Sequence, residues 1–126
     1  MDPIYIKETD SSPSVILDKG NKTFLLSGKS LPENVITFYD PVIKWLEKYA
    51  KDPLEKTTFE IILDYFNTAS SKLLLDIFNI LEEIQKNGSE VEINWHYADY
   101  DEEMMEAGIE YSEMVEVKFN QILINP

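Results

Sequence analysis

The chain has 126 residues, no cysteine, and 24 acidic residues against 11 lysines, which gives a formal net charge of −13 at pH 7. Disulfide and thiolate chemistry are therefore excluded, and nucleic acids and anionic membranes are disfavoured as partners because both attract Lys- and Arg-rich surfaces. The length and the 44% hydrophobic content predict a single packed domain over residues 1–126. With no signal peptide or long apolar run in evidence, we expect a soluble, cytoplasmic protein.

The first third of the chain has the pattern of short strands. Residues 4–6 predict an edge strand, because the preceding Pro cannot donate to a ladder. Residues 14–17 and 23–27 flank the loop DKGNK, which predicts an antiparallel β-hairpin. Gly28 and Ser30 are expected to end this β-rich region before the first helix.

A long helix is predicted from about residue 33 to residue 51. The apolar residues on its expected buried face are Val35, Phe38, Tyr39, Val42, Leu46 and Tyr49. Pro41 interrupts this pattern and allows two interpretations. Either one helix kinks at Pro41, or Asp40 caps a second helix in which Pro41 takes the first position.

The central part of the chain predicts a buried strand followed at once by a helix. Residues 57–66 are rich in β-branched and aromatic side chains, with Phe59, Ile61 and Leu63 on one face. The helix that follows extends to Lys86. Its apolar stripe consists of Leu74, Ile77, Phe78, Leu81 and Ile84, widened by Leu73 and Ile80.

The junction between this strand and this helix carries small polar residues where a helix needs its first N–H groups satisfied. Asn67 or Thr68 is expected to be the N-cap, and the junction is expected to be exposed. A phosphate on Thr68 would meet the partial positive charge of the helix N-terminus. Lys72, one turn along, would be a counter-charge.

Asn87 and Gly88 provide a helix stop, and residues 90–97 predict another strand. Val91, Ile93 and Trp95 alternate with polar residues on that strand. His96, the only histidine, falls on the polar face. A catalytic role for His96 is conceivable, but we favour a surface residue because no partner residue for catalysis can be named.

Residues 98–117 contain eight carboxylates and no lysine. Their spacing does not fit a calcium loop of the EF-hand type, and we predict no metal site. We expect a short helix whose apolar side is formed by Met104, Met105, Ile109 and Met114. Its acidic side is either a solvated face or a docking surface for a basic partner. Residues 119–124 predict a final strand.

This order of elements predicts an α/β domain with a mixed sheet. We expect a mostly parallel centre with right-handed crossovers, two main helices, a short third helix and the N-terminal antiparallel β-hairpin. Thr68 then lies at the carboxyl end of a central strand, where open α/β sheets generally present functional groups.

Motifs for enzymatic chemistry were not found. The sequence has no Gly-rich phosphate loop, no G-x-S-x-G elbow and no H-E-x-x-H. We therefore predict no catalytic residue and no cofactor. A module that binds a small ligand or a nucleotide at the strand-to-helix junction stays open as an alternative.

Three segments of the chain resemble a known family. Residues 30–49, 63–78 and 91–108 are similar to the SiaC family of small bacterial regulatory phosphoproteins, whose STAS-like domain resembles anti-sigma factor antagonists. The most specific block is YFNT-x-SSK, and the family's reversibly phosphorylated threonine falls on Thr68. Ala69 departs from the family, in which serine is frequent at that position, and leaves Thr68 in place.

The resemblance implies a partner-switching regulator. A partner kinase would phosphorylate Thr68 and a partner phosphatase would remove the phosphate. The unphosphorylated form would bind and regulate an effector, which in the family is a diguanylate cyclase. We expect the contact surface to include Asn67, Ser70, Ser71 and Lys72.

Overall fold

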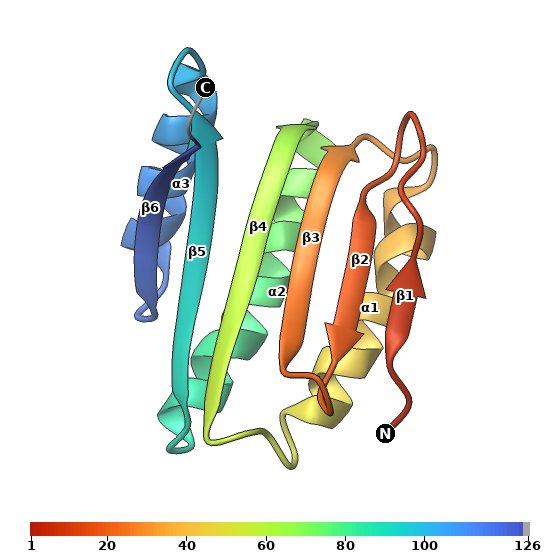
Figure 1. Cartoon of the computed structure of the whole chain (residues 1–126), viewed down its shortest axis with the longest axis vertical. Coiled ribbons are helices and arrows are strands. Elements are labelled where there is room, and N and C mark those ends of the chain that lie inside the picture. The colour runs from red at the N-terminus through yellow and green to blue at the C-terminus, as the bar shows by residue number, and fades with distance from the viewer. Residues whose placement is uncertain (125–126) are drawn as a thin grey trace.

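A mixed β-sheet organises the fold. In the computed structural model, which describes residues 1–124, six strands form one sheet in the order β1-β2-β3-β4-β5-β6. The strands are β1 (Ile4–Ile6), β2 (Ser14–Asp18), β3 (Thr23–Ser30), β4 (Lys56–Phe66), β5 (Glu90–Ala98) and β6 (Lys118–Ile124). The pairs β1/β2 and β2/β3 are antiparallel, and β3 to β6 are parallel (Figure 1). The predicted mixed sheet, with its edge strand and N-terminal hairpin, is confirmed.

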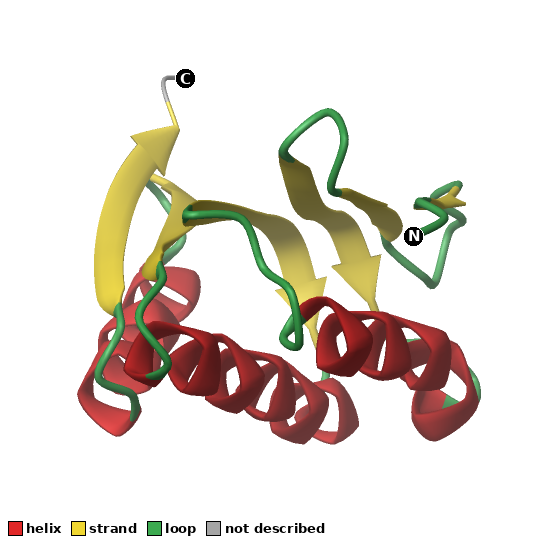
Figure 2. Ribbon diagram, turned by 90° about the horizontal axis from the view of Figure 1, so that it is seen from below, coloured by secondary structure: helices red, strands yellow, loops and turns green. Residues whose placement is uncertain are grey.

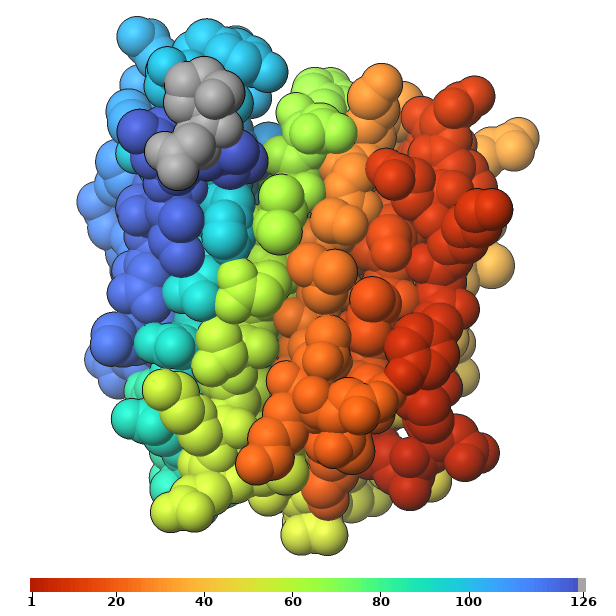
Figure 3. Space-filling model, viewed as in Figure 1, coloured from red at the N-terminus to blue at the C-terminus, as the bar shows by residue number. Residues whose placement is uncertain are grey.

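Each pair of neighbouring parallel strands is connected by a helix. These helices are α1 (Val35–Tyr49), α2 (Thr68–Lys86) and α3 (Glu102–Met114). Because the strands follow one another in chain order and the crossovers share one hand, all three helices lie on the same face of the sheet (Figure 2). The opposite face carries no helix and shows its strands side by side (Figure 3).

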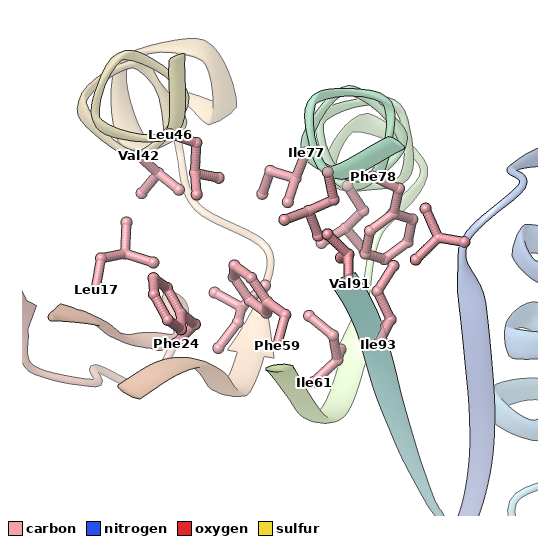
Figure 4. Close-up of a cluster of buried hydrophobic side chains, with 14 of the residues drawn as sticks. Leu17, Phe24, Val42, Leu46, Phe59, Ile61, Ile77, Phe78, Val91 and Ile93 are labelled. Atoms are coloured by element: carbon pink, nitrogen blue, oxygen red, sulfur yellow. The ribbon is translucent and has the colours of Figure 1, made fainter. Parts of the chain in front are cut away.

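The core lies between the sheet and the three helices, and α3 contributes Met104 and Tyr111 to it. Figure 4 shows Val42 and Leu46 of α1 directed towards the sheet on the side of Leu17 and Phe24. The whole predicted stripe of α2 is buried: Leu74, Ile77, Phe78, Leu81 and Ile84. Burying one such side chain contributes about 1.5–3 kcal/mol, so this face fixes the position of α2.

Pro41 lies inside one continuous helix. The Asn34 Oδ1 atom accepts a hydrogen bond from the Thr37 backbone N–H at 3.1 Å. Asn34 is therefore the N-cap, and the helix begins well before Pro41. The interpretation in which Asp40 caps a separate helix is therefore wrong. Asp40 is exposed and instead forms an ion pair with Lys44 at 3.0 Å.

Strand β3 continues beyond the point at which the sequence suggested a break. Gly28 has φ 107°, a conformation that glycine adopts without a steric penalty, and the register with β4 shifts between Gly28 and Lys29. At this irregularity β4 has one extra residue, Asp64, and pairing continues to Ser30 opposite Phe66. As a result, Ser30 reaches the start of α2.

Helix α3 is rotated from the expected orientation. Its buried residues are Met104, Gly108 and Tyr111, whereas Ile109 and Met114 are 42% and 58% exposed. The apolar side predicted for this helix was thus wrong at Ile109 and Met114. Packing on Trp95 sets the orientation: the Trp95 indole N–H donates to the Met104 carbonyl at 2.9 Å, and a Cβ at Gly108 would lie 2.5 Å from Trp95 Cδ1.

Candidate functional site

Thr68 is the first residue of α2 and directly follows the carboxyl end of β4. The preceding residue, Asn67, has extended backbone angles (φ −87°, ψ 172°), and its Oδ1 atom accepts the Ser70 backbone N–H at 2.8 Å. Asn67 is therefore the N-cap, which settles the choice between Asn67 and Thr68. Thr68 is exposed, and within residues 1–124 its hydroxyl forms no hydrogen bond with the protein. This hydroxyl is open to modification.

Ser70, two residues later, is 0% exposed. Its hydroxyl donates to the Ser30 carbonyl at 2.9 Å and accepts from the Ser30 hydroxyl at 2.9 Å. The Tyr39 hydroxyl of α1 completes this group, at 2.5 Å from the Ser30 hydroxyl. We call Ser30, Tyr39 and Ser70 the hydroxyl cluster. The junction was expected to be exposed, and this expectation is wrong at Ser70, which lies against Ser30.

The hydroxyl cluster joins the start of α2 to both β3 and α1. The Ser30 carbonyl also accepts the Asn67 backbone N–H at 3.0 Å, so one carbonyl binds both the N-cap and the first turn. Burial raises the pKa of Tyr39 to about 12, although the hydrogen bond with Ser30 works in the opposite direction. Tyr39 is thus a neutral hydroxyl donor at physiological pH.

Ser71 connects the same turn to α3. Its hydroxyl donates to the Thr68 carbonyl at 2.7 Å, and its own carbonyl accepts the Tyr111 hydroxyl at 2.8 Å. Burial raises the pKa of Tyr111 above its ordinary value, so this hydroxyl also keeps its proton. The next residue, Lys72, is exposed. The backbone around Thr68 is therefore held from both sides.

A hollow of about 390 Å³ lies between α2 and α3, beside this turn. Its apolar lining consists of Phe66, Leu75, Ala107, Tyr111 and Met114. Ser71, Lys72 and Glu110 are the polar residues that line it. We call this hollow the α2/α3 groove. Sequence analysis missed it because its lining comes from β4, α2 and α3, which are distant in the chain.

The outer surface of α3 is strongly acidic. Glu102, Glu103, Glu106, Glu110 and Glu113 are all exposed, as the sequence analysis expected. No lysine lies between residues 98 and 117 to offset them. The start of α2, in contrast, carries the positive charge of Lys72 and the positive end of the helix dipole. Opposite charges thus lie on the two helices that border the groove.

His96 lies on the open face of the sheet, at the far side from the helices. Its Nε2 atom is 2.7 Å from Glu60 Oε1, and the Asn94 amide donates to the other Glu60 oxygen at 2.7 Å. These groups form a polar network on neighbouring strands. Among residues 1–124, no three His, Asp or Glu side chains come together in a way that would hold a metal ion.

In the described part of the chain, no helix combines the length and the apolar character that a transmembrane span requires.

Comparison with known proteins identifies the family. The model of the SiaC family regulatory phosphoproteins matches residues 6–124. The structure of SiaC of Pseudomonas aeruginosa superposes with a TM-score of 0.88 at 30% identity and covers 98% of this chain and 100% of that chain. An uncharacterized protein of Pseudomonas aeruginosa strain UCBPP-PA14 is 32% identical over 113 residues, which is 90% of each chain.

SiaC has also been solved with a partner, in the crystal structure of the diguanylate cyclase SiaD in complex with its activator SiaC from Pseudomonas aeruginosa. The match to this structure has a TM-score of 0.90 at 30% identity and covers 96% of this chain and 99% of that chain. Both the family model and these structures extend over nearly the whole sequence. The chain belongs to the SiaC family of regulatory phosphoproteins.

Proposed function

We propose that this protein is a non-enzymatic switch that is phosphorylated on Thr68 and that binds and regulates a diguanylate cyclase when unphosphorylated. The observation that carries the proposal is the exposed hydroxyl of Thr68, which has no hydrogen bond within residues 1–124 and stands at the N-terminus of a 19-residue helix. The relative from Pseudomonas aeruginosa supports the choice of partner, since SiaC is described there as the activator of the cyclase SiaD.

The modification requires two partner enzymes. A protein kinase would transfer the γ-phosphoryl group of ATP to Thr68 Oγ1. The new O–P bond would form as ADP leaves, and a base of the kinase would accept the hydroxyl proton. A protein phosphatase would hydrolyse that bond with water and release inorganic phosphate. Because the proposed exchange uses ATP, we expect it to take place in the cytoplasm.

The surroundings of Thr68 are suited to a phosphate. The helix N-terminus offers backbone N–H groups and a partial positive charge, and Lys72 is one turn away. The backbone is held by the hydroxyl cluster on one side and by the Tyr111 hydroxyl on the other. Phosphorylation therefore adds close to two negative charges to a surface whose shape stays the same.

The switch then operates through partner affinity. A phosphate pressed against an apolar or acidic partner surface is poorly solvated and repelled, so the complex dissociates without unfolding of the chain. A change in occupancy from 99:1 to 1:99 requires a difference of about 5.5 kcal/mol in binding free energy. We assign the contact surface to Thr68, Asn67, Ser71 and Lys72, while Ser70 positions the turn from inside.

The test compares effector binding by defined variants in calorimetry with a purified diguanylate cyclase of the host organism. We expect Thr68→Ala to bind like the unmodified protein, and Thr68→Asp, which carries a single charge, to bind on the order of a hundredfold more weakly. The phosphorylated protein should bind on the order of ten-thousandfold more weakly, which corresponds to the difference of about 5.5 kcal/mol. Thr37→Asp is the matched control, because it places the same charge in the capped first turn of α1. Equal binding by Thr68→Ala and Thr68→Asp would show that the charge mechanism is wrong.

A ligand-binding module is the second candidate function. The α2/α3 groove, at about 390 Å³, falls within the size range of about 300–1,000 Å³ for small-molecule pockets. The groove offers a nucleotide one ammonium group, that of Lys72, and one carboxylate, that of Glu110. An increase in melting temperature on addition of nucleotide, with no change in protein mass, would support this candidate over the phosphorylation switch.

A further inference from the structure

We propose that the free edge of the sheet at β6 is the surface on which two copies of this chain associate. The two β6 strands would pair in an antiparallel arrangement about a two-fold axis, and the two α3 helices would pack side by side next to them. This inference goes beyond the proposed function and does not depend on it, because β6 is the edge strand of the sheet and Thr68 follows the central strand β4.

The two edges of the sheet differ in their protection. Within residues 1–124, β1 pairs only with β2 and β6 only with β5, so each edge strand leaves one row of backbone groups unpaired. Strand β1 has three residues and follows Pro3, and short strands and prolines protect a free edge. Strand β6 has seven residues, no proline and one charged residue, Lys118. The edge at β6 is therefore open to another strand (Figure 1).

Helix α3 places apolar side chains beside this edge. The Gln121 side chain of β6 donates to the Met105 carbonyl at 2.9 Å, so α3 packs directly on the edge strand. Met105 and Ile109 are each two residues from Ala107, which lines the α2/α3 groove. They therefore lie about 200° around the helix axis from Ala107, on the side away from α2. Ile109 is 42% exposed there.

Strand β6 adds a further apolar side chain to the same side of the edge. Phe119 and Trp95 have ring centroids 6.0 Å apart, and Phe119 packs on the core, so it faces the helical layer. Leu123 follows Phe119 by four residues and therefore points to the same layer. Leu123 is 49% exposed. Ile109 and Leu123 thus offer apolar surface that gains free energy when a partner removes it from water.

The charge distribution favours a second copy at this edge. The chain carries 24 acidic residues, but residues 117–124 contain none. Two molecules with a net charge of −13 repel each other, and a contact through this segment adds no carboxylate pair to that repulsion. With the two-fold axis at Gln121, Lys118 of one copy would lie opposite Ile124 of the other. No like charges would then meet between the two strands.

The strand and the helix at this edge match in length. The seven residues of β6 span about 23 Å and the 13 residues of α3 about 20 Å. Antiparallel pairing of two β6 strands in one continued sheet keeps both helical layers on the same side. Helix α3 of one copy would therefore lie next to α3 of the other. Met105 and Ile109 would be covered there while the strand backbones exchange hydrogen bonds.

The first experiment is sedimentation equilibrium of the full, unphosphorylated chain over a range of concentrations, comparing Ile109→Glu with Met114→Glu. Both residues are exposed on α3, but Met114 lines the groove on the side of α2. We expect the natural protein to dimerise and Ile109→Glu to weaken the dimer at least about tenfold, because a charge would be buried in an apolar contact. Met114→Glu adds the same charge outside the contact and should weaken the dimer less than about twofold.

Two further measurements separate the apolar contact from other effects. Ile109→Lys lowers the net negative charge and should nevertheless weaken the dimer, because it also buries a charge. Melting temperatures of the dilute, monomeric variants should equal that of the natural protein, which would establish that the fold is intact.

Hydrogen exchange tests the pairing of the strands. Alternate backbone N–H groups of β6 face β5, and the others face the free edge. We expect the second set to be protected at concentrations at which the dimer forms and to exchange rapidly in Ile109→Glu. A dimer without this protection would overturn the proposed pairing.

Three other results would overturn the proposal. They are a monomer at every concentration, equal weakening by Ile109→Glu and Met114→Glu, and a monomer that binds a purified diguanylate cyclase through Ile109. The last result would assign the edge to the cyclase and not to a second copy. Thr68→Asp should leave the dimer unchanged, so failure of the phosphorylation switch and failure of this proposal can be distinguished.

Discussion

Two hydroxyl residues in the first turn of α2, Thr68 and Ser70, have opposite surroundings. Ser70 is 0% exposed and bonded to Ser30, whereas Thr68 is exposed and its hydroxyl has no hydrogen bond within residues 1–124. Residues two positions apart in an α-helix differ by about 200° around the helix axis. When one of them faces the core, the other therefore faces solvent. Helical phase, and not residue type, therefore determines which hydroxyl of this polar block a kinase would reach.

The largest effect on stability is expected from a charge at the buried position, Ser70. Ser70→Asp would place a carboxylate against the Ser30 carbonyl in a site without exposure, and we expect a loss of unfolding free energy on the order of 3 kcal/mol or more. Urea denaturation measures this loss. Equal midpoints for Ser70→Asp and Thr68→Asp would mean that the two positions do not differ in burial.

The hydroxyl cluster also predicts a pH dependence. The ordinary pKa of tyrosine is 10.0, and burial raises that of Tyr39 to about 12 in the folded protein. Between these values the unfolded chain loses a proton that the folded chain keeps, so stability is complete below pH 10 and falls as pH rises towards 12. The corresponding loss is about 2–3 kcal/mol.

The variant Tyr39→Phe isolates this contribution. Phe at position 39 has no proton to lose, so its unfolding free energy should fall less steeply between pH 10 and 12 than that of the natural protein. Chemical denaturation at several pH values gives both slopes. Parallel slopes for the two proteins would contradict the assignment of the buried hydroxyl.

Substitutions at the exposed position, Thr68, should change the stability only slightly. We expect Thr68→Ala to change stability by less than about 0.5 kcal/mol, and Thr68→Asp to stabilise by a few tenths through the helix dipole. Asn67→Ala, which removes the cap on the Ser70 N–H, should cost about 1 kcal/mol. Thermal unfolding of the three variants checks this ranking, and a Thr68→Ala loss as large as that of Asn67→Ala would show that Thr68 has a structural role.

Local periodicity accounts for most of the fold that the sequence predicted. The alternation in β4 and the apolar spacing in α2 are repeated several times within one element, and the structure confirms both patterns. Helix α3 is shorter and has few apolar residues, and the apolar side expected from its sequence included Ile109 and Met114, which are exposed in the structure. Trp45 was also missed on the buried face of α1.

The site was predictable at Thr68 but not around it. The polar run after β4 indicated a helix start, which the structure confirms with Asn67 as the cap. The burial of Ser70 depends on Ser30, which is 40 residues away in sequence and pairs with the end of β4 beyond the register shift at Gly28. Long-range contacts of this kind leave no periodic pattern in a single sequence.

The most direct test of the switch is intact-mass analysis with site mapping after incubation with ATP and the host's partner kinase. Exposure predicts one phosphate on Thr68, with Ser70 unmodified because it is 0% exposed and hydrogen-bonded. A phosphate on Ser70, or an unmodified protein in the presence of a kinase shown to be active, would contradict the account and leave Thr68 as an ordinary first residue of α2.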